Sequence, residues 1–335
     1  MIKDVNKFKE IQESRKVRIG MTYAALGAPL LGIAFGFAGL AGDVYPFNIA
    51  FPTGSMTFQF FELMFGVLTV FIYSLVTGTA KDNIRVLRAR ISWYGVFMAM
   101  TGLIADFLFF SSSAIVGGAI AGPLAGLFGF WGAVFTSLIY REKMMQKWTL
   151  IGCVFIAIGI WVASGGMSLA APEGVSNITI AIGAGMGLLA AIIYGIENFA
   201  IAAGSDLMPE ESSLFWRAGW AVVGAIILNF IIMPQFTEIA TIMLKDPMWW
   251  AFAAVTGGAW GIFMIVALYM GINTAGTVGG GILASTGFVW ATILSMTVYG
   301  GNEWSTSIFV GTIILFIGIS IMLLRPSNLI TKLRS

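Results

Sequence analysis

The sequence predicts an all-α integral membrane protein, and three observations lead to this class. Of its 335 residues, 58% are hydrophobic and only 10% are charged, whereas a soluble protein has about 25% charged residues. The mean hydropathy is +0.91. Apolar stretches of about 20 residues, the length of a transmembrane helix, recur along the chain. Lipid must therefore be the solvent for most of the chain, which excludes a water-soluble enzyme.

Charged, Gly, Pro and Asn residues divide the chain into ten such stretches, and we predict that each forms one transmembrane helix. A short turn at 111–113 separates the third stretch from the fourth, and another at 271–274 separates the eighth from the ninth. The predicted spans are 19–41, 57–78, 92–112, 114–140, 149–168, 178–203, 213–235, 248–271, 275–299 and 308–324.

The basic residues predict how these spans are oriented, since Lys and Arg stay on the cytoplasmic side of a membrane. Of the 18 Lys and Arg residues, all but Arg217 and Lys245 lie before the first span, in alternate connections or after the last span. We therefore expect a multi-pass protein of the cytoplasmic (inner) membrane with both termini in the cytoplasm.

The two ends of the chain lie outside the predicted spans. Residues 1–18 combine charges with apolar residues at a spacing of three, as in an amphipathic helix on an anionic leaflet. A disordered basic segment accounts for them equally well. They lack an early apolar core with a small-residue cleavage site, so we do not expect a signal peptide. Residues 325–335 are expected to form a cytoplasmic tail.

Composition also excludes several kinds of chemistry. The chain has no His and a single Cys, Cys153, inside an apolar stretch, which argues against an imidazole base, a His/Cys metal site or an intramolecular disulfide. There is no Gly-rich loop ending in Lys-Ser/Thr for a nucleotide, and no basic patch with interleaved aromatic residues for nucleic acid. We expect no metal and no cofactor.

An internal repeat with an offset of 159 residues relates the two halves of the chain. The best stretch compares 113–160 with 272–319. Five spans per copy is an odd number, so the second copy must cross the membrane in the opposite sense. The sequence thus predicts two five-helix repeats of inverted topology, at 19–168 and 178–324. The matching pairs include Trp131 with Trp290, Tyr140 with Tyr299, Gly36 with Gly195 and Gly102 with Gly261.

From about residue 19 to 324, and especially in the fourth and fifth spans, the chain resembles the drug/metabolite transporter superfamily, in its EamA-type branch. The resemblance rests on the ten spans in two inverted halves, the Gly-rich run 117–159 with Pro123, the charged turn at 141–143 and Trp148. At 300–301 this chain has Gly-Gly where the family pattern usually has Gly-Glu. The resemblance implies a transporter of amino acids, sugars, nucleotide precursors, quaternary amines or drugs, and it does not choose among them.

Four charged residues fall inside predicted spans, where a charge costs at least about 2.5–3.5 kcal/mol. The acidic ones lie on helix faces of mostly small or polar residues at spacings of three and four, so we expect them to point into the bundle. These residues are Glu62, Asp106, Glu197 and Arg217.

The predicted topology places Glu62 and Asp106 in the outer half of the membrane, and Glu197 and Arg217 in the inner half. We expect Glu62 and Asp106 to bind a cationic group or a proton in a coupling role; a paired or neutral structural role is the alternative. Glu197 and Arg217, on consecutive helices, are expected to form an ion pair that acts as a gate or a structural contact, or to contact the substrate.

Most of the 11 Trp and 8 Tyr residues fall at span ends, where amphipathic rings settle at the interface. The deeper rings are candidates for a substrate site, in which ring faces can hold an ammonium group, although packing alone also accounts for them. The candidate substrate-binding residues are Asp106, Glu62, Glu197, Tyr194, Asn198, Trp131, Trp260, Tyr269 and Trp290.

Helix breaks near the middle of a span often mark the site of a transporter. We expect helix breaks that bend the first span at Pro29, the fourth at Pro123, and the ninth at Gly280, which lies at the repeat-equivalent depth. Close helix packing through small residues is the alternative explanation for the glycines.

Together these features predict a secondary active transporter that works by alternating access and acts without enzymatic chemistry, and proton exchange at Asp106 or Glu62 is the coupling hypothesis. An amine-bearing or zwitterionic metabolite is the favoured substrate, from acidic groups beside aromatic rings, and a neutral sugar or an aromatic compound is the alternative. A channel-like protein or a scaffold would share the hydropathy but would not need inverted repeats. The expected partners are a small-molecule substrate and the lipid bilayer, with the protein a monomer or a homodimer.

Overall fold

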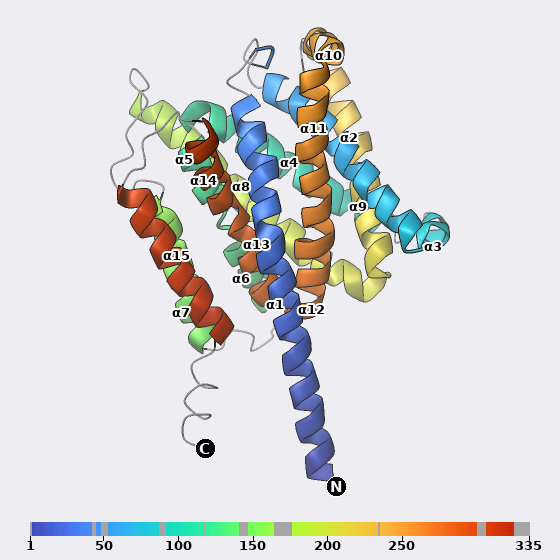
Figure 1. Ribbon diagram of the computed structural model, residues 1–335, viewed down its shortest axis with the longest axis vertical. Helices are drawn as coiled ribbons and strands as arrows, with labels where there is room; N and C mark the ends of the chain where they lie inside the picture. The colour runs from blue at the N-terminus through green and yellow to red at the C-terminus, as the bar shows by residue number, and fades with distance from the viewer. Residues whose placement is uncertain are drawn as a thin grey trace.

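The computed structural model describes residues 2–41, 45–47, 53–86, 92–116, 118–140, 147–163, 176–233, 235–299 and 306–324. Every element of regular structure in these ranges is a helix, which confirms the all-α prediction. The helices form one bundle in which α1 runs along much of the long axis (Figure 1).

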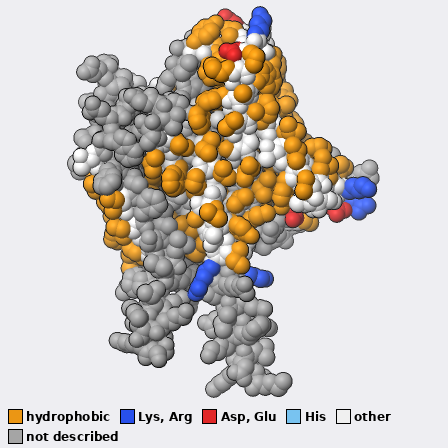
Figure 2. Space-filling view, viewed as in Figure 1, with side chains coloured by type: hydrophobic (Ala, Val, Ile, Leu, Met, Phe, Trp, Pro, Cys, Tyr) orange, Lys and Arg blue, Asp and Glu red, His pale blue; other side chains and the backbone are white. Residues whose placement is uncertain are grey.

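Six helical segments in the described ranges are long and apolar enough to cross a membrane. Large apolar side chains are exposed along them, as Leu68, Ile72 and Val76 are on α2. Figure 2 shows apolar side chains over most of the described surface, with Lys and Arg at its edges. An apolar surface of this extent needs lipid around it, so the chain is a multi-pass membrane protein. The six segments are Lys16–Phe37, Thr53–Val76, Trp93–Val116, Ile178–Gly204, Glu211–Ile232 and Pro247–Gly276.

The first half of the chain supplies seven of the helices in the described ranges. A two-residue turn at 126–127 separates α5 from α6. These helices are α1 (Ile2–Ala41), α2 (Thr53–Val76), α3 (Ala80–Val86), α4 (Ser92–Val116), α5 (Gly118–Ala125), α6 (Phe128–Tyr140) and α7 (Lys147–Ala163).

The second half begins at α8 (Asn177–Leu207), whose first turn is capped by Ser176 through a bond from the Thr179 amide. The segments that follow contain three π-helical stretches, η1 to η3. They are α9 (Glu210–Ile227), η1 (Leu228–Ile232), α10 (Phe236–Lys245), α11 (Pro247–Phe263), η2 (Met264–Ile272), α12 (Asn273–Gly276), η3 (Thr277–Gly281), α13 (Ile282–Ser285), α14 (Gly287–Tyr299) and α15 (Thr306–Leu324).

Some predicted boundaries were wrong. The helix α1 begins at Ile2, so residues 2–18 are helical and continuous with the first predicted span; they contain no Gly or Pro that would end the helix. The predicted turn at 111–113 lies inside α4. The connection predicted at 271–274 is also helical, and the backbone changes direction at Gly276, which has φ of +76°.

The three expected helix breaks had different outcomes. The helix α1 continues through Pro29 without interruption, because one missing backbone bond is tolerated inside a packed bundle. The fourth span is interrupted, three residues after Pro123, at the turn between α5 and α6. Gly280 lies in η3, directly after the change of direction at Gly276.

Glycines set the closest approaches between helices. In the first span, a methyl group at Gly36 would lie 3.2 Å from the carbonyl oxygen of Ala291 on α14. On α8, a methyl group at Gly195 would lie 2.9 Å from the backbone nitrogen of Gly132 on α6. The helix α1 therefore packs on α14, and α8 packs on α6. In the same way α4 packs on α9, and α11 packs on α2.

Candidate functional site

Asp106 accepts hydrogen bonds from side chains on two other helices. Its Oδ1 accepts a bond from the hydroxyl of Tyr194 on α8, and its Oδ2 accepts one from Nε2 of Gln59 on α2. All three side chains are buried. Each carboxylate oxygen therefore has a partner, and the two bonds tie α2 and α8 to α4.

Arg217 and Glu197 form a buried ion pair between α9 and α8. The guanidinium donates to Oε1 of Glu197 through Nε, at 2.8 Å, and also through Nη2. Its central carbon lies 5.0 Å from the centre of the Trp260 ring on α11, a geometry of cation–π attraction. The predicted pairing of Glu197 with Arg217 is thus present. Charge pairing of this kind offsets part of the cost of removing both ions from water.

Gly102 on α4 makes room for this ion pair. A methyl group at its position would lie 2.7 Å from Nη2 of Arg217 and 2.9 Å from Oε1 of Glu197. Because Gly102 and Asp106 are four residues apart, they lie on the same face of α4. The ion pair and the Asp106 carboxylate therefore meet at one face of this helix.

A small cavity lies among these groups, with a volume of about 30 Å³. A space of this size holds about one or two water molecules. Four phenylalanines from α1, α6, α11 and α14 form much of its apolar wall: Phe35, Phe128, Phe263 and Phe288. The polar side chains that line it are Asp106, Tyr194, Glu197, Asn198 and Arg217.

This arrangement corrects the predicted depths of the charged residues. Asp106 was expected in the outer half, away from Glu197 and Arg217, yet all three line the same cavity. Predicted span boundaries carry an error of a few residues, and each residue shifts the depth by about 1.5 Å. Tyr194 lies one turn before Glu197 on α8, and its phenol group reaches the Asp106 carboxylate on the neighbouring helix.

Glu62 lies apart from this cavity, although it is also buried, with 5% of its surface exposed. It is on α2, three residues after Gln59. Within the part of the chain that the structure describes, its Oε1 has no hydrogen-bond partner. The charged group that acts on it is Asp106. Glu62 is thus an acid without the partners that Asp106 has.

Two of the predicted aromatic residues pack elsewhere. Trp131 lies against Gly195 and between the rings of Phe130 and Phe135. Trp290 lies against Gly32 of α1, where a methyl group would be 2.4 Å from its Cβ. Both are therefore packing residues at the closest helix contacts and do not line the cavity.

The remaining predicted side chains lie at or near the cavity. Tyr194, Asn198 and Trp260 line it. Tyr269 is buried on η2 and interacts electrostatically with Arg217 without lining the cavity.

Sequence reasoning missed Gln59, Gly102 and the four phenylalanines of the cavity wall as site residues. Gln59 gave a signal, because it is a polar residue one turn from Glu62 on the same face of a span. Gly102 gave one too, because it lies one turn from Asp106. The phenylalanines gave none, since the chain has 27 of them.

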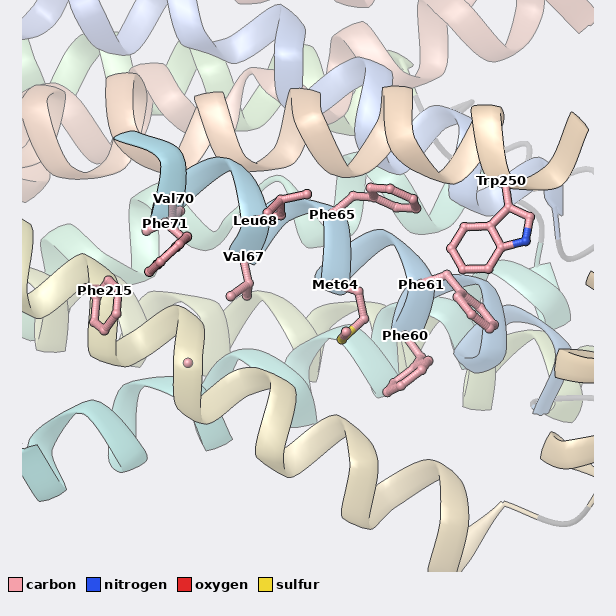
Figure 3. Close-up of a pocket in the computed structure, with 11 residues that line it drawn as sticks. Phe60, Phe61, Met64, Phe65, Val67, Leu68, Val70, Phe71, Phe215 and Trp250 are labelled. Carbon is pink, nitrogen blue, oxygen red and sulfur yellow. The ribbon is translucent and has the colours of Figure 1, made fainter. Parts of the chain in front are cut away.

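A second, larger hollow lies on the outside of the bundle, with a volume of about 460 Å³. Figure 3 shows its lining, which comes mainly from α2 and includes Phe215 of α9 and Trp250 of α11. The lining is apolar apart from the indole nitrogen of Trp250, which donates to the carbonyl oxygen of Leu244. This groove offers no charged group to a polar ligand, so the cavity at Asp106 is the better candidate site.

The described residues contain no group of three His, Cys, Asp or Glu side chains that could hold a metal ion. The hydroxyl group of Ser112, near Asp106 in sequence, donates to the carbonyl oxygen of Gly183 at 2.8 Å. It thus joins α4 to α8.

No family model and no curated protein matches the chain. Among solved structures, 26 chains are similar to it. One of them, described only as a crystal structure of a protein, has a TM-score of 0.60 and 19% sequence identity. The similarity covers 94% of this chain and 99% of that chain. At this identity the similarity concerns the fold alone, and it extends over nearly the whole length of both proteins.

Proposed function

We propose that the protein is a secondary active transporter that moves a small polar or amphiphilic metabolite across the membrane by alternating access. The observation that carries this proposal is the small buried cavity lined by Asp106, Glu197 and Arg217 among helices long and apolar enough to span a membrane. Charged groups at such a depth are costly, and they are retained mainly along the paths of substrates, ions or protons.

Two inverted five-helix repeats, ten spans in all, would supply the two conformations that this mechanism requires. The contacts of the glycines support this arrangement. Gly36 packs against Ala291, and Gly195 packs against Gly132. The repeat offset of 159 residues converts the first pair into the second. The pairing of α4 with α9 is matched in the same way by that of α11 with α2.

The volume of the cavity is consistent with an occluded state in such a cycle. Drug-sized ligands occupy pockets of about 300–1,000 Å³, and the cavity here measures about 30 Å³. A substrate could enter only after helices separate. The irregular segment from η2 to α13, with its turn at Gly276, packs on α1 and on α6. It is the segment that we assign to this movement.

Proton coupling is the second part of the proposal. Asp106 and Glu62 interact electrostatically, so protonation of one affects the other. We assign the coupling role to this pair. The ion pair of Glu197 and Arg217 would act as a gate, because opening the bundle between α8 and α9 requires it to separate or move.

For localisation we propose the cytoplasmic membrane with both termini in the cytoplasm, from the distribution of Lys and Arg. The family we propose is the drug/metabolite transporter superfamily, EamA type. An amine-bearing or zwitterionic substrate remains favoured. The phenylalanine walls of the cavity support an aromatic or neutral compound as the second candidate.

The test is ligand binding followed by transport. Purified protein is heated with amines, amino acids, sugars and nucleosides, and a ligand of the folded form raises the melting temperature. Compounds that bind are then tested for saturable counterflow into proteoliposomes, with and without a pH gradient. Asp106→Asn and Glu62→Gln should abolish the response to the gradient. Flux that does not saturate would instead indicate a channel, and the absence of any flux a scaffold.

A further inference from the structure

Two residues that line the central cavity each carry a buried hydrogen-bond donor without an acceptor. The donors are Nδ2 of Asn198 and Nη1 of Arg217, each with no partner among the described residues. Both side chains are nearly inaccessible, at 2% and 5% exposed, and both residues line the cavity. An unsatisfied buried donor costs about 1–3 kcal/mol, and more when it is charged. Two of them at one cavity indicate a missing acceptor.

Three carboxylate oxygens of the cavity already accept hydrogen bonds. Both oxygens of Asp106 accept bonds, from Tyr194 and Gln59, and Oε1 of Glu197 accepts two bonds from Arg217. A ligand that offers only donors, such as a simple amine, would leave Asn198 and Nη1 of Arg217 unsatisfied. A ligand with a carboxylate would satisfy both, since each of its oxygens can accept one bond.

The charges of the cavity argue for a second group on the same ligand. Two acids, Asp106 and Glu197, face a single cation, Arg217. A ligand with only negative charge would add to the excess of acids, whereas an ammonium group beside its carboxylate would balance it. A zwitterion therefore fits both the unpaired donors and the surplus of acidic groups.

We propose that Asn198 Nδ2 and Arg217 Nη1 together bind the carboxylate of a zwitterionic substrate, whose ammonium group lies toward Asp106 and Glu197. This inference rests on the proposed transport function and narrows it to one substrate class. The apolar walls, which include Phe35, Phe128 and Phe288, would surround the side chain of the substrate, which favours an aromatic or large apolar one.

The experiment compares four probes of similar shape: phenylalanine, phenylalanine amide, phenethylamine and 3-phenylpropionate. Each is tested for thermal stabilisation of the purified full chain and for counterflow into proteoliposomes, in chloride buffer and in chloride-free gluconate buffer. The variants are Asn198→Leu, which removes the unpaired donor at similar volume, and Asn198→Asp, which replaces the donor by an acceptor. Trp220→Phe is the matched control. It also removes a buried unpaired donor, but one outside the cavity.

We expect phenylalanine to bind, and the amide, the amine and 3-phenylpropionate to bind at least about 10-fold more weakly. Asn198→Leu should raise the melting temperature of the ligand-free protein, because it deletes an unsatisfied donor, and should weaken phenylalanine binding about 10-fold or more. Asn198→Asp should weaken it further. Trp220→Phe should leave the affinity for phenylalanine unchanged. A residue with a purely structural role would not combine higher stability with lower affinity.

The carboxylate site and the transport function can fail separately in this experiment. Counterflow of phenethylamine or the amide equal to that of phenylalanine, or normal affinity in Asn198→Leu, would reject the carboxylate site while transport remains. Stabilisation by chloride alone would show that the donors of Asn198 and Arg217 bind an inorganic anion, which rejects the carboxylate site. Stabilisation by none of the four probes would reject zwitterions as the substrate class. If none of the probes binds but sugars or nucleosides show counterflow, the transport proposal stands. If no compound shows counterflow, both proposals are rejected.

Discussion

The buried acids of this protein fall into two groups. Two of these acids accept hydrogen bonds. Glu197 accepts from Arg217, and Asp106 accepts from Tyr194 and Gln59. Glu62 is equally buried, and among the described residues its Oε1 has no hydrogen-bond partner. The same side-chain chemistry therefore supports two roles. An acid that accepts bonds from a neighbouring helix also holds the helices together, whereas Glu62 can exchange a proton without breaking a bond at Oε1.

The largest loss of stability should follow from removing the positive charge of Arg217. Arg217→Ala leaves Glu197 buried without its partner, and breaking a buried pair in this way costs about 3–5 kcal/mol. The free energy of unfolding, measured in detergent, should fall by this amount, and little folded protein should be recovered. The double variant Arg217→Met with Glu197→Leu should regain most of the loss. A single variant as stable as the double one would show that Glu197 does not depend on Arg217.

A smaller effect should follow from removing one donor to Asp106. Tyr194→Phe deletes the hydroxyl group that donates to Oδ1, and bonds to a charged acceptor contribute about 1.5–3 kcal/mol. The unfolding free energy should decrease within that range. Gln59→Leu removes the other donor, and the double variant completes a cycle. Additive effects in the cycle would mean that the two donors do not act on one carboxylate.

Gly102→Ala tests the space that α4 leaves for the ion pair. The new methyl group would lie under 3 Å from both Arg217 and Glu197, and such overpacking costs about 1–3 kcal/mol. Gly185→Ala, in α8, is the control, because nothing lies within 4 Å of its added methyl group. This control should be neutral or stabilising, since Ala favours helix. Equal thermal shifts in the two variants would contradict the close approach at Gly102.

The smallest effect on stability should come from Glu62→Gln. This change breaks no hydrogen bond at Oε1, so we expect the unfolding free energy to change by less than about 0.5 kcal/mol. Transport in proteoliposomes should nevertheless lose its response to a pH gradient. Glu238→Gln, at an exposed position of α10, is the matched control and should keep that response. A loss of stability near that of Tyr194→Phe would place Glu62 in the partnered group.

Helical periodicity predicted much of the candidate site. Asp106, Glu197 and Arg217 were identified from their burial in apolar spans and from the small residues on their faces, and the ion pair followed from their places on consecutive helices. Their common depth could not be predicted in this way. Span boundaries carry an error of a few residues, and each residue shifts depth by about 1.5 Å. Trp131 and Trp290 were misassigned because a deep ring in a packing contact has the same sequence signal as a ring in a cavity.

The sequence by itself determined that this chain is helical and membrane-embedded, and which charged side chains face inward. Both follow from local composition and from the helical period, which do not depend on which helices become neighbours. Only the tertiary structure decided that Asp106 accepts hydrogen bonds at both oxygens while Oε1 of Glu62 accepts none from the described residues. Gln59 and Tyr194 are 47 and 88 residues away from Asp106 in the chain, so their bonds exist only once α2, α4 and α8 pack together. The unpaired donors of Asn198 and Arg217 depend on the same packing, because a partner is present or missing only when all neighbours are in place.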